Sequence, residues 1–112
     1  MEIWKDIEGF EQYQVSTWGR IRNKHTGVLL KPYYNKKGYL KVGLSKNGKS
    51  HKFRVNRLVA MAFIPNIFDL PQVNHKDGNK ANNSFTNLEW VTDEENKRHR
   101  QMMIRGNDET LL

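Results

Sequence analysis

The stretch 72–99 constrains the fold more than any other part of this 112-residue chain. A short extended run ends at His75, a polar, asparagine-rich loop with a turn signal follows, and a second apolar run covers 87–91. Thr92 and Glu95 then have the spacing of a capping box, which marks the start of a helix. The sequence therefore predicts strand, long loop, strand and helix in this order, here called the ββα unit.

The side chains of this unit have the chemistry needed to cut a phosphodiester. His75 can act as a general base near neutral pH. Amide and carboxylate oxygens suit a hard cation such as Mg²⁺, and Asn96 on the predicted helix can face back toward the strand that ends at His75. One base and one metal ion are enough for hydrolysis.

Charge is distributed unevenly along the chain, whose formal net charge is +7. No Asp or Glu occurs in 12–68, although Lys and Arg are frequent there. A short run of this kind is usually a solvated face, but its length favours a polyanionic partner. Phosphate contacts would supply affinity and register rather than sequence choice.

The basic stretch has the pattern of strands. We expect short extended segments at 28–30, 38–44 and 51–55, with an Asn-Gly hairpin turn between the last two. Alternation in 38–44 directs Tyr39 and Lys41 outward. The sequence thus predicts a small twisted antiparallel sheet that can follow DNA, with an ordinary basic sheet as the alternative.

A short apolar helix is expected to join this sheet to the ββα unit. Asn56 is its predicted N-cap, and Pro65 ends it. The predicted fold class is α+β: an N-terminal antiparallel β-sheet module at 1–55, then the linking helix and ββα unit at 56–103. A flexible tail is expected at 104–112.

Several blocks of sequence together resemble one family. Residues 4–10 read W-K-D-I-E-G-F, residues 13–21 read Y-Q-V-S-T-W-G-R-I, and residues 56–65 read N-R-L-V-A-M-A-F-I-P. With the stretch 72–99, they resemble the HNH endonucleases of the phage homing type, which nick one strand with a single metal ion. The resemblance covers roughly residues 2 to 99, and three ordered blocks carry it: the N-terminal pattern within 4–21, the segment 56–65 and the stretch 72–99.

The resemblance implies roles for particular residues. It places the general base on His75, the metal ligands on Asn74 and Asn96, and a loop-bracing role in catalysis on Asn87. The implied cofactor is one Mg²⁺ or Mn²⁺ ion per site. Asn74 stands where this group often has Asp, and Asn56 stands where the pattern usually has His.

The activity implied is hydrolysis of a DNA phosphodiester, leaving 5′-phosphate and 3′-hydroxyl ends. A single site predicts nicking by a monomer or weak homodimer. The expected DNA-contacting residues are the basic side chains Arg20, Arg22, Lys36, Lys37, Lys41, Lys76 and Lys80.

Two alternatives remain at this point: a DNA-binding module whose catalysis has weakened or been lost, and an RNA-binding or RNA-cleaving protein. The absence of cysteine excludes disulfides and a thiolate zinc site. The longest apolar run, 58–65, is too short to cross a bilayer. We therefore expect a cytoplasmic protein without a membrane partner, located in the host cytoplasm if a phage encodes it.

Overall fold

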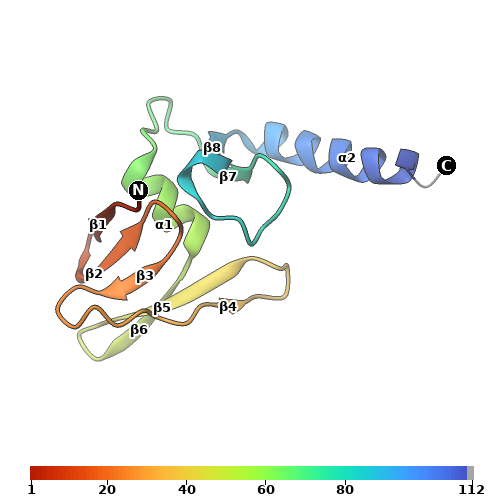
Figure 1. Cartoon of the computed structure of the whole chain (residues 1–112). Coiled ribbons are helices and arrows are strands. Elements are labelled where there is room, and N and C mark those ends of the chain that lie inside the picture. The colour runs from red at the N-terminus through yellow and green to blue at the C-terminus, as the bar shows by residue number, and fades with distance from the viewer. Residues whose placement is uncertain (111–112) are drawn as a thin grey trace.

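The computed structural model describes residues 1–110, with side chains described as far as Met103. Three small antiparallel sheets surround one short helix, and a long helix leads away from the third sheet (Figure 1). The α+β class predicted from the sequence is confirmed. None of the helices described is long and apolar enough to span a membrane.

The first sheet has the order β1-β2-β3. Its strands are β1 (Trp4–Ile7), β2 (Phe10–Ser16) and β3 (Ile21–Asn23). Val15 in the central strand lies opposite Lys5 and Ile21 and is fully buried. One face of this sheet therefore contributes to the core, as alternation in a half-buried strand requires.

The second sheet comprises β4 (Tyr33–Tyr34), β5 (Leu40–Lys46) and β6 (Lys49–Arg54). A two-residue turn joins β5 to β6, with φ of 52° at Asn47 and 75° at Gly48. This confirms the predicted Asn-Gly hairpin, because such turns need positive φ at both central positions. The expected extended segment 28–30 is too short to form a strand of its own, but it pairs with β3 through the bridge between Leu29 and Arg22 and two flanking backbone hydrogen bonds.

Helix α1 (Val55–Phe63) begins directly after β6. Its N-cap is Arg54 and not Asn56 as predicted, because β6 continues into the helix without an intervening loop. Asn56 instead lies inside the first turn, 3% exposed. Its Oδ1 is the one buried side-chain oxygen or nitrogen, among the side chains described, that lacks a hydrogen-bond partner.

The ββα unit follows the predicted order. It contains β7 (Gln72–His75), the 3₁₀ turn η1 (Phe85–Asn87), β8 (Leu88–Val91) and α2 (Asp93–Thr110). The capping box is confirmed: the Thr92 backbone N–H donates to Glu95 Oε1 at 3.1 Å, and the Glu95 N–H donates to Thr92 Oγ1 at 3.0 Å. Within the predicted tail 104–112, α2 continues to Thr110, and residues 111–112 lie outside the described part.

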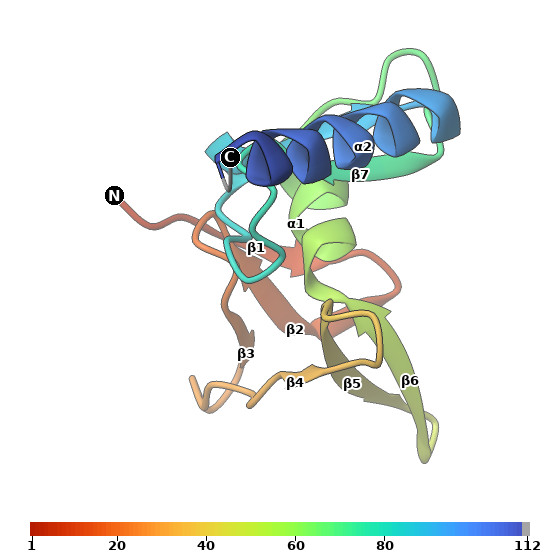
Figure 2. The same cartoon turned by 90° about the vertical axis from the view of Figure 1, so that its right-hand side faces the viewer.

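A single hydrophobic core joins these parts. Figure 2 shows α1 lying between the two N-terminal sheets and the ββα unit. The buried core includes side chains from all of them, namely Ile7, Val15, Ile21, Val42, Leu44, Val55, Leu58, Val59, Ala60, Val73 and Leu88. The β-sheet module and the ββα unit therefore share one core, and this packing fixes how the basic sheet is oriented toward the candidate site.

Candidate active site

His75 occupies the last position of β7 and is 5% exposed. Its Nε2 lies 2.7 Å from Oδ1 of Asn83, across the loop of the ββα unit. An amide oxygen can only accept a hydrogen bond, so Nε2 carries the proton in this arrangement. The other ring nitrogen, Nδ1, is then the basic one.

The surroundings of His75 favour the neutral imidazole. Burial lowers its pKa below the ordinary value of 6.5, and the nearby Lys80 ammonium acts in the same direction. The hydrogen bond to Asn83 and the charge of Asp77 oppose this shift. The net lowering leaves His75 able to accept a proton at neutral pH, which is what a general base requires.

Asn87 connects the two ends of the loop that follows His75. Its Oδ1 accepts the Asp77 N–H at 3.1 Å, while its Nδ2 donates to Asp77 Oδ1 and to the Asn82 carbonyl, both at 2.9 Å. The pKa of Asp77 is lowered by hydrogen bonds from Asn82, the Asn79 backbone and Asn87. Asn87 therefore ties Asp77, at the start of the loop, to Asn82 farther along it.

Asn74 and Asn96, the two expected metal ligands, line the same hollow as His75. This hollow has a volume of about 220 Å³, and His99 also lines it. Asn96 lies in the first turns of α2, where its backbone N–H donates to the Thr92 carbonyl at 3.0 Å. The structure thus brings together an imidazole and two amide side chains from β7 and α2.

The chemistry of this donor set fits a hard cation bound with help from a phosphate. Among the residues described, no group of three or more His, Cys, Asp or Glu side chains could hold a metal ion. A cation in the hollow would therefore be held by the neutral amide oxygens of Asn74 and Asn96, with further oxygen ligands from DNA and water. Neutral oxygen donors suit Mg²⁺ or Mn²⁺ better than a soft metal.

Three residues near the hollow were not among the site residues expected from the sequence. Asn83 holds His75, Glu89 accepts a hydrogen bond from Asn74, and the Tyr39 ring centroid lies 6.1 Å from that of His75. Glu89 could have been found from the hairpin register, which places it opposite Asn74. No local signal links Tyr39 to His75, because the two are distant in sequence.

The expected DNA-contacting residues form two groups. Lys37 and Lys80 lie beside the site, where the Lys80 ammonium donates to the Lys37 carbonyl at 2.7 Å. Both line a second hollow of about 590 Å³ that adjoins the first. The other lining side chains of this second hollow are Tyr39, Arg54, Gln72, Asp93, Asn96, Lys97 and Arg100.

The other expected contacts line neither of these two hollows. Lys36 is exposed in the turn before β5, Lys41 lies in β5, and Lys76 is exposed directly after His75. Arg20, directly before β3, and Arg22, in β3, both contact other side chains of the N-terminal module.

Arg20 forms a two-pronged ion pair with Glu2, and the Arg22 guanidinium lies 4.0 Å from the Trp4 ring centroid. A phosphate would have to compete with Glu2 for Arg20.

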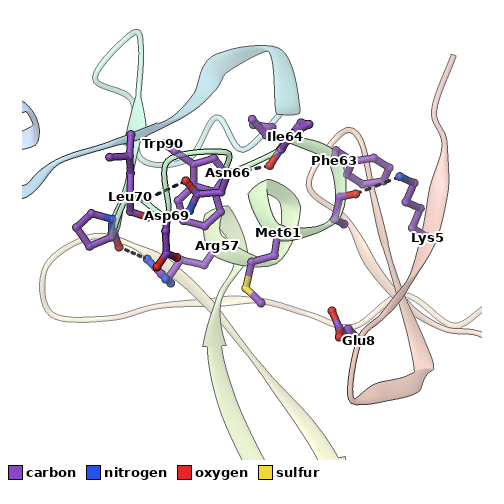
Figure 3. Close-up of a pocket in the computed structure, with 13 residues that line it drawn as sticks. Lys5, Glu8, Arg57, Met61, Phe63, Ile64, Asn66, Asp69, Leu70 and Trp90 are labelled. Carbon is purple, nitrogen blue, oxygen red and sulfur yellow. Dashed lines mark hydrogen bonds between the residues drawn. The ribbon is translucent and has the colours of Figure 1, made fainter.

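Another hollow of the described surface lies away from the candidate site, on the outer side of α1 (Figure 3). Its volume is about 670 Å³, and no expected catalytic or metal-binding residue lines it. Around it, Arg57 Nη1 donates to the Pro71 carbonyl and Trp90 Nε1 donates to the Ile64 carbonyl, both at 2.9 Å. These bonds fasten the loop between α1 and β7 and so help to hold the ββα unit.

The N-terminal module supports the loop that holds His75. Gly19 has a φ of +87°, and a Cβ atom built there would lie 2.9 Å from Asn83 Cβ and 3.0 Å from the Asn83 carbonyl oxygen. Nearby, the Phe85 N–H donates to the Thr17 carbonyl at 2.9 Å. The first sheet is therefore in contact with the residue that accepts the His75 hydrogen bond.

Gly19→Ala is expected to lower the cleavage rate at least about tenfold, because the added methyl displaces Asn83 and frees the His75 ring. Gly27→Ala is the matched control: its φ is +74°, and a Cβ there meets nothing within 4 Å. Both variants carry the backbone strain of a left-handed residue, about 1–2 kcal/mol. Rates are measured where unfolding curves show both variants to be folded, and equal rates would contradict the coupling.

Comparison with known proteins identifies the class of this site. The NUMOD4 motif matches residues 2–45, and the HNH endonuclease family matches residues 54–98. The HNH match spans the strand that ends at His75, the asparagine-rich loop and the start of the capped helix, which meet at one hollow. The chain belongs to the HNH endonuclease family, with a NUMOD4 motif ahead of its nuclease unit.

Individual relatives agree with this assignment. The chain is 46% identical over 104 residues to the DNA endonuclease I-HmuI of Bacillus phage SP01. This alignment covers 92% of this chain and 59% of the relative. It is 48% identical over 96 residues to the uncharacterized HNH endonuclease L245 of Acanthamoeba polyphaga mimivirus, covering 86% of this chain and 29% of that relative.

A solved structure that describes DNA binding and cleavage by the HNH homing endonuclease I-HmuI has the same fold. It aligns with a TM-score of 0.80 and 46% identity, over 93% of this chain and 59% of that chain. The chain thus spans 29% of the length of L245 and 59% of the length of I-HmuI.

Proposed function

We propose that this chain cuts one strand of duplex DNA by hydrolysis that depends on a single divalent ion, Mg²⁺ or Mn²⁺. One observation supports the proposal most: His75, with its Nε2 bonded to Asn83, shares a hollow with Asn74 and Asn96. Membership of the HNH endonuclease family, and a relative described as binding and cleaving DNA, support the choice of substrate.

In the proposed mechanism, Nδ1 of His75 takes a proton from the attacking water. Asn83 keeps the ring in the tautomer that leaves Nδ1 free, and Asn87 keeps the loop that carries Asn83 in place. Asn74 and Asn96 would hold the ion by their amide oxygens. When bound, Mg²⁺ or Mn²⁺ supplies positive charge at the scissile phosphate and the departing 3′ oxygen.

The basic hollow beside the site is the proposed path of the cleaved strand. The Tyr39 ring has the Arg54 guanidinium 4.1 Å and the Lys80 ammonium 4.6 Å from its centroid. Packing on the ring reduces the freedom of both cations, so they can meet a phosphate with less loss of entropy. Lys37 and Arg100 extend this basic surface.

Replacing Lys36, Lys37 and Lys41 together by Gln is expected to weaken DNA binding across unrelated sequences. The slope of log affinity against log salt should flatten by about 0.9 for each phosphate that the variant no longer neutralises. Sequence preference should change little, since phosphates carry no base identity. Lys24→Gln is the control, because the Lys24 ammonium is already 2.8 Å from Asp6 Oδ2. A triple variant with unchanged affinity and slope would make these lysines a solvated surface.

The experiment for the proposed function is a supercoiled-plasmid assay with EDTA, Mg²⁺, Mn²⁺, Ca²⁺ and Zn²⁺ in parallel. We expect open circles with Mg²⁺ or Mn²⁺ and none with EDTA. DNA binding without cleavage in any metal would favour a module that has lost catalysis. The same assay on single-stranded RNA tests the remaining alternative, and faster cleavage of RNA than of DNA would overturn the proposed substrate.

A further inference from the structure

Glu89 is the nearest carboxylate partner of the Asn74 amide. Asn74 in β7 lies directly opposite Glu89 in β8, and Asn74 Nδ2 donates to Glu89 Oε1 at 2.9 Å. An ionised carboxylate can only accept hydrogen bonds, so the group that faces it has to be the NH₂. Glu89 therefore determines which way the Asn74 amide is turned, with Oδ1 on the side away from Glu89.

The Oδ1 atom of Asn74 remains available. Asn74 as a whole residue is only 5% exposed. Among the described side chains, the one buried oxygen or nitrogen without a hydrogen-bond partner is Asn56 Oδ1, so Asn74 Oδ1 is not a buried atom without a partner. No hydrogen bond to Asn74 Oδ1 is found among the described residues, so this atom keeps some contact with solvent. The opening that Asn74 lines is the hollow shared with His75 and Asn96.

We propose that Glu89 is a positioning residue for the divalent ion: it turns Asn74 Oδ1 toward the hollow and supplies, one hydrogen bond away, the negative charge that a neutral amide lacks. This inference rests on the proposed metal site. A carboxylate that accepts from an amide N–H polarises the amide and makes its oxygen a stronger donor, as carboxylate partners do for metal-bound side chains.

The charge of Glu89 is not used in an ion pair. The salt bridges of the described side chains join Arg20 to Glu2, Lys24 to Asp6 and Arg98 to Glu94, so none involves Glu89. If Asn74 and Glu89 were an ordinary cross-strand pair, the pair would stabilise the hairpin and its loss would be seen in the unfolding curve of the protein. Metal affinity therefore separates a positioning role from a structural one.

The test is Mn²⁺ binding to the purified protein, followed by the electron paramagnetic resonance signal of the free ion. Glu89→Ala is expected to weaken binding about 10- to 100-fold. Glu89→Gln, which can still accept the Asn74 bond, is expected to lie between that variant and wild type. Glu94→Ala, with the same change in net charge at an exposed position, should bind Mn²⁺ as wild type does.

The decisive arm uses Asn74→Asp as the background. An aspartate has two accepting oxygens and needs no orientation, and Glu89 then opposes a second carboxylate. The double variant Asn74→Asp, Glu89→Ala should bind Mn²⁺ as tightly as the Asn74→Asp variant or more tightly. With Asn74 in place, Glu89→Ala should instead weaken Mn²⁺ binding.

Two results would overturn the inference alone: wild-type affinity in both Glu89→Ala and Glu89→Gln, or an equal loss in both backgrounds. Wild-type protein that binds no Mn²⁺ would overturn the proposed metal site as well. Glu89→Gln preserves the hydrogen bond, so it remains a test if Glu89→Ala does not fold. The expected result is then a few-fold loss of Mn²⁺ affinity relative to wild type.

Discussion

His75→Ala is expected to reduce plasmid nicking at least about a hundredfold while DNA affinity stays near that of wild type. The variant removes the proposed base but none of the basic side chains, so the rate of the chemical step changes and binding does not. Single-turnover nicking and an electrophoretic binding assay measure the two quantities separately. Near-normal nicking by the folded variant would show that His75 is not the base.

The pH profile gives a second measurement on the same residue. Only the neutral imidazole can accept a proton, so activity should rise with pH through the pKa of His75 and level off above it. Because burial lowers that pKa, the midpoint should fall below 6.5. A rate that rises mainly in the alkaline range, well above that midpoint, would mean that another group titrates.

Asn96→Ala is expected to abolish metal-dependent nicking. The variant removes one of the two amide oxygens that would hold the ion, and alanine is favourable in a helix, so α2 should form normally. Mg²⁺ titration of the nicking rate measures the effect, with circular dichroism to verify folding. His99→Ala serves as the comparison, because His99 lines the same hollow. Normal cleavage by Asn96→Ala together with loss in His99→Ala would transfer the metal role to His99.

Local sequence signals predicted the parts of the fold that local interactions determine. The Asn-Gly turn, the Thr92–Glu95 capping box and the strand that ends at His75 all occur as predicted. The start of α1 was mispredicted because Asn56 has the residue type of an N-cap. The actual boundary follows from β6 continuing into the helix, which residue type does not reveal.

Contacts between distant segments could not be predicted from the sequence. The loop contained several asparagines, and only the fold shows that Asn83 is the one bonded to His75. The approach of Gly19 to Asn83 depends on packing of the first sheet against the ββα unit. Likewise, counting basic residues could not show that Arg20 is paired with Glu2, which reduces its availability to DNA.

The most direct test of single-strand hydrolysis is ligation of the nicked product. Supercoiled plasmid is treated with the protein and Mg²⁺ until open circles accumulate, and DNA ligase is then added. The proposed chemistry leaves 5′-phosphate and 3′-hydroxyl ends on one strand, so ligase should reseal the open circles into covalently closed DNA. Linear DNA formed without an open-circle intermediate, or open circles that ligase cannot seal, would contradict the proposed reaction.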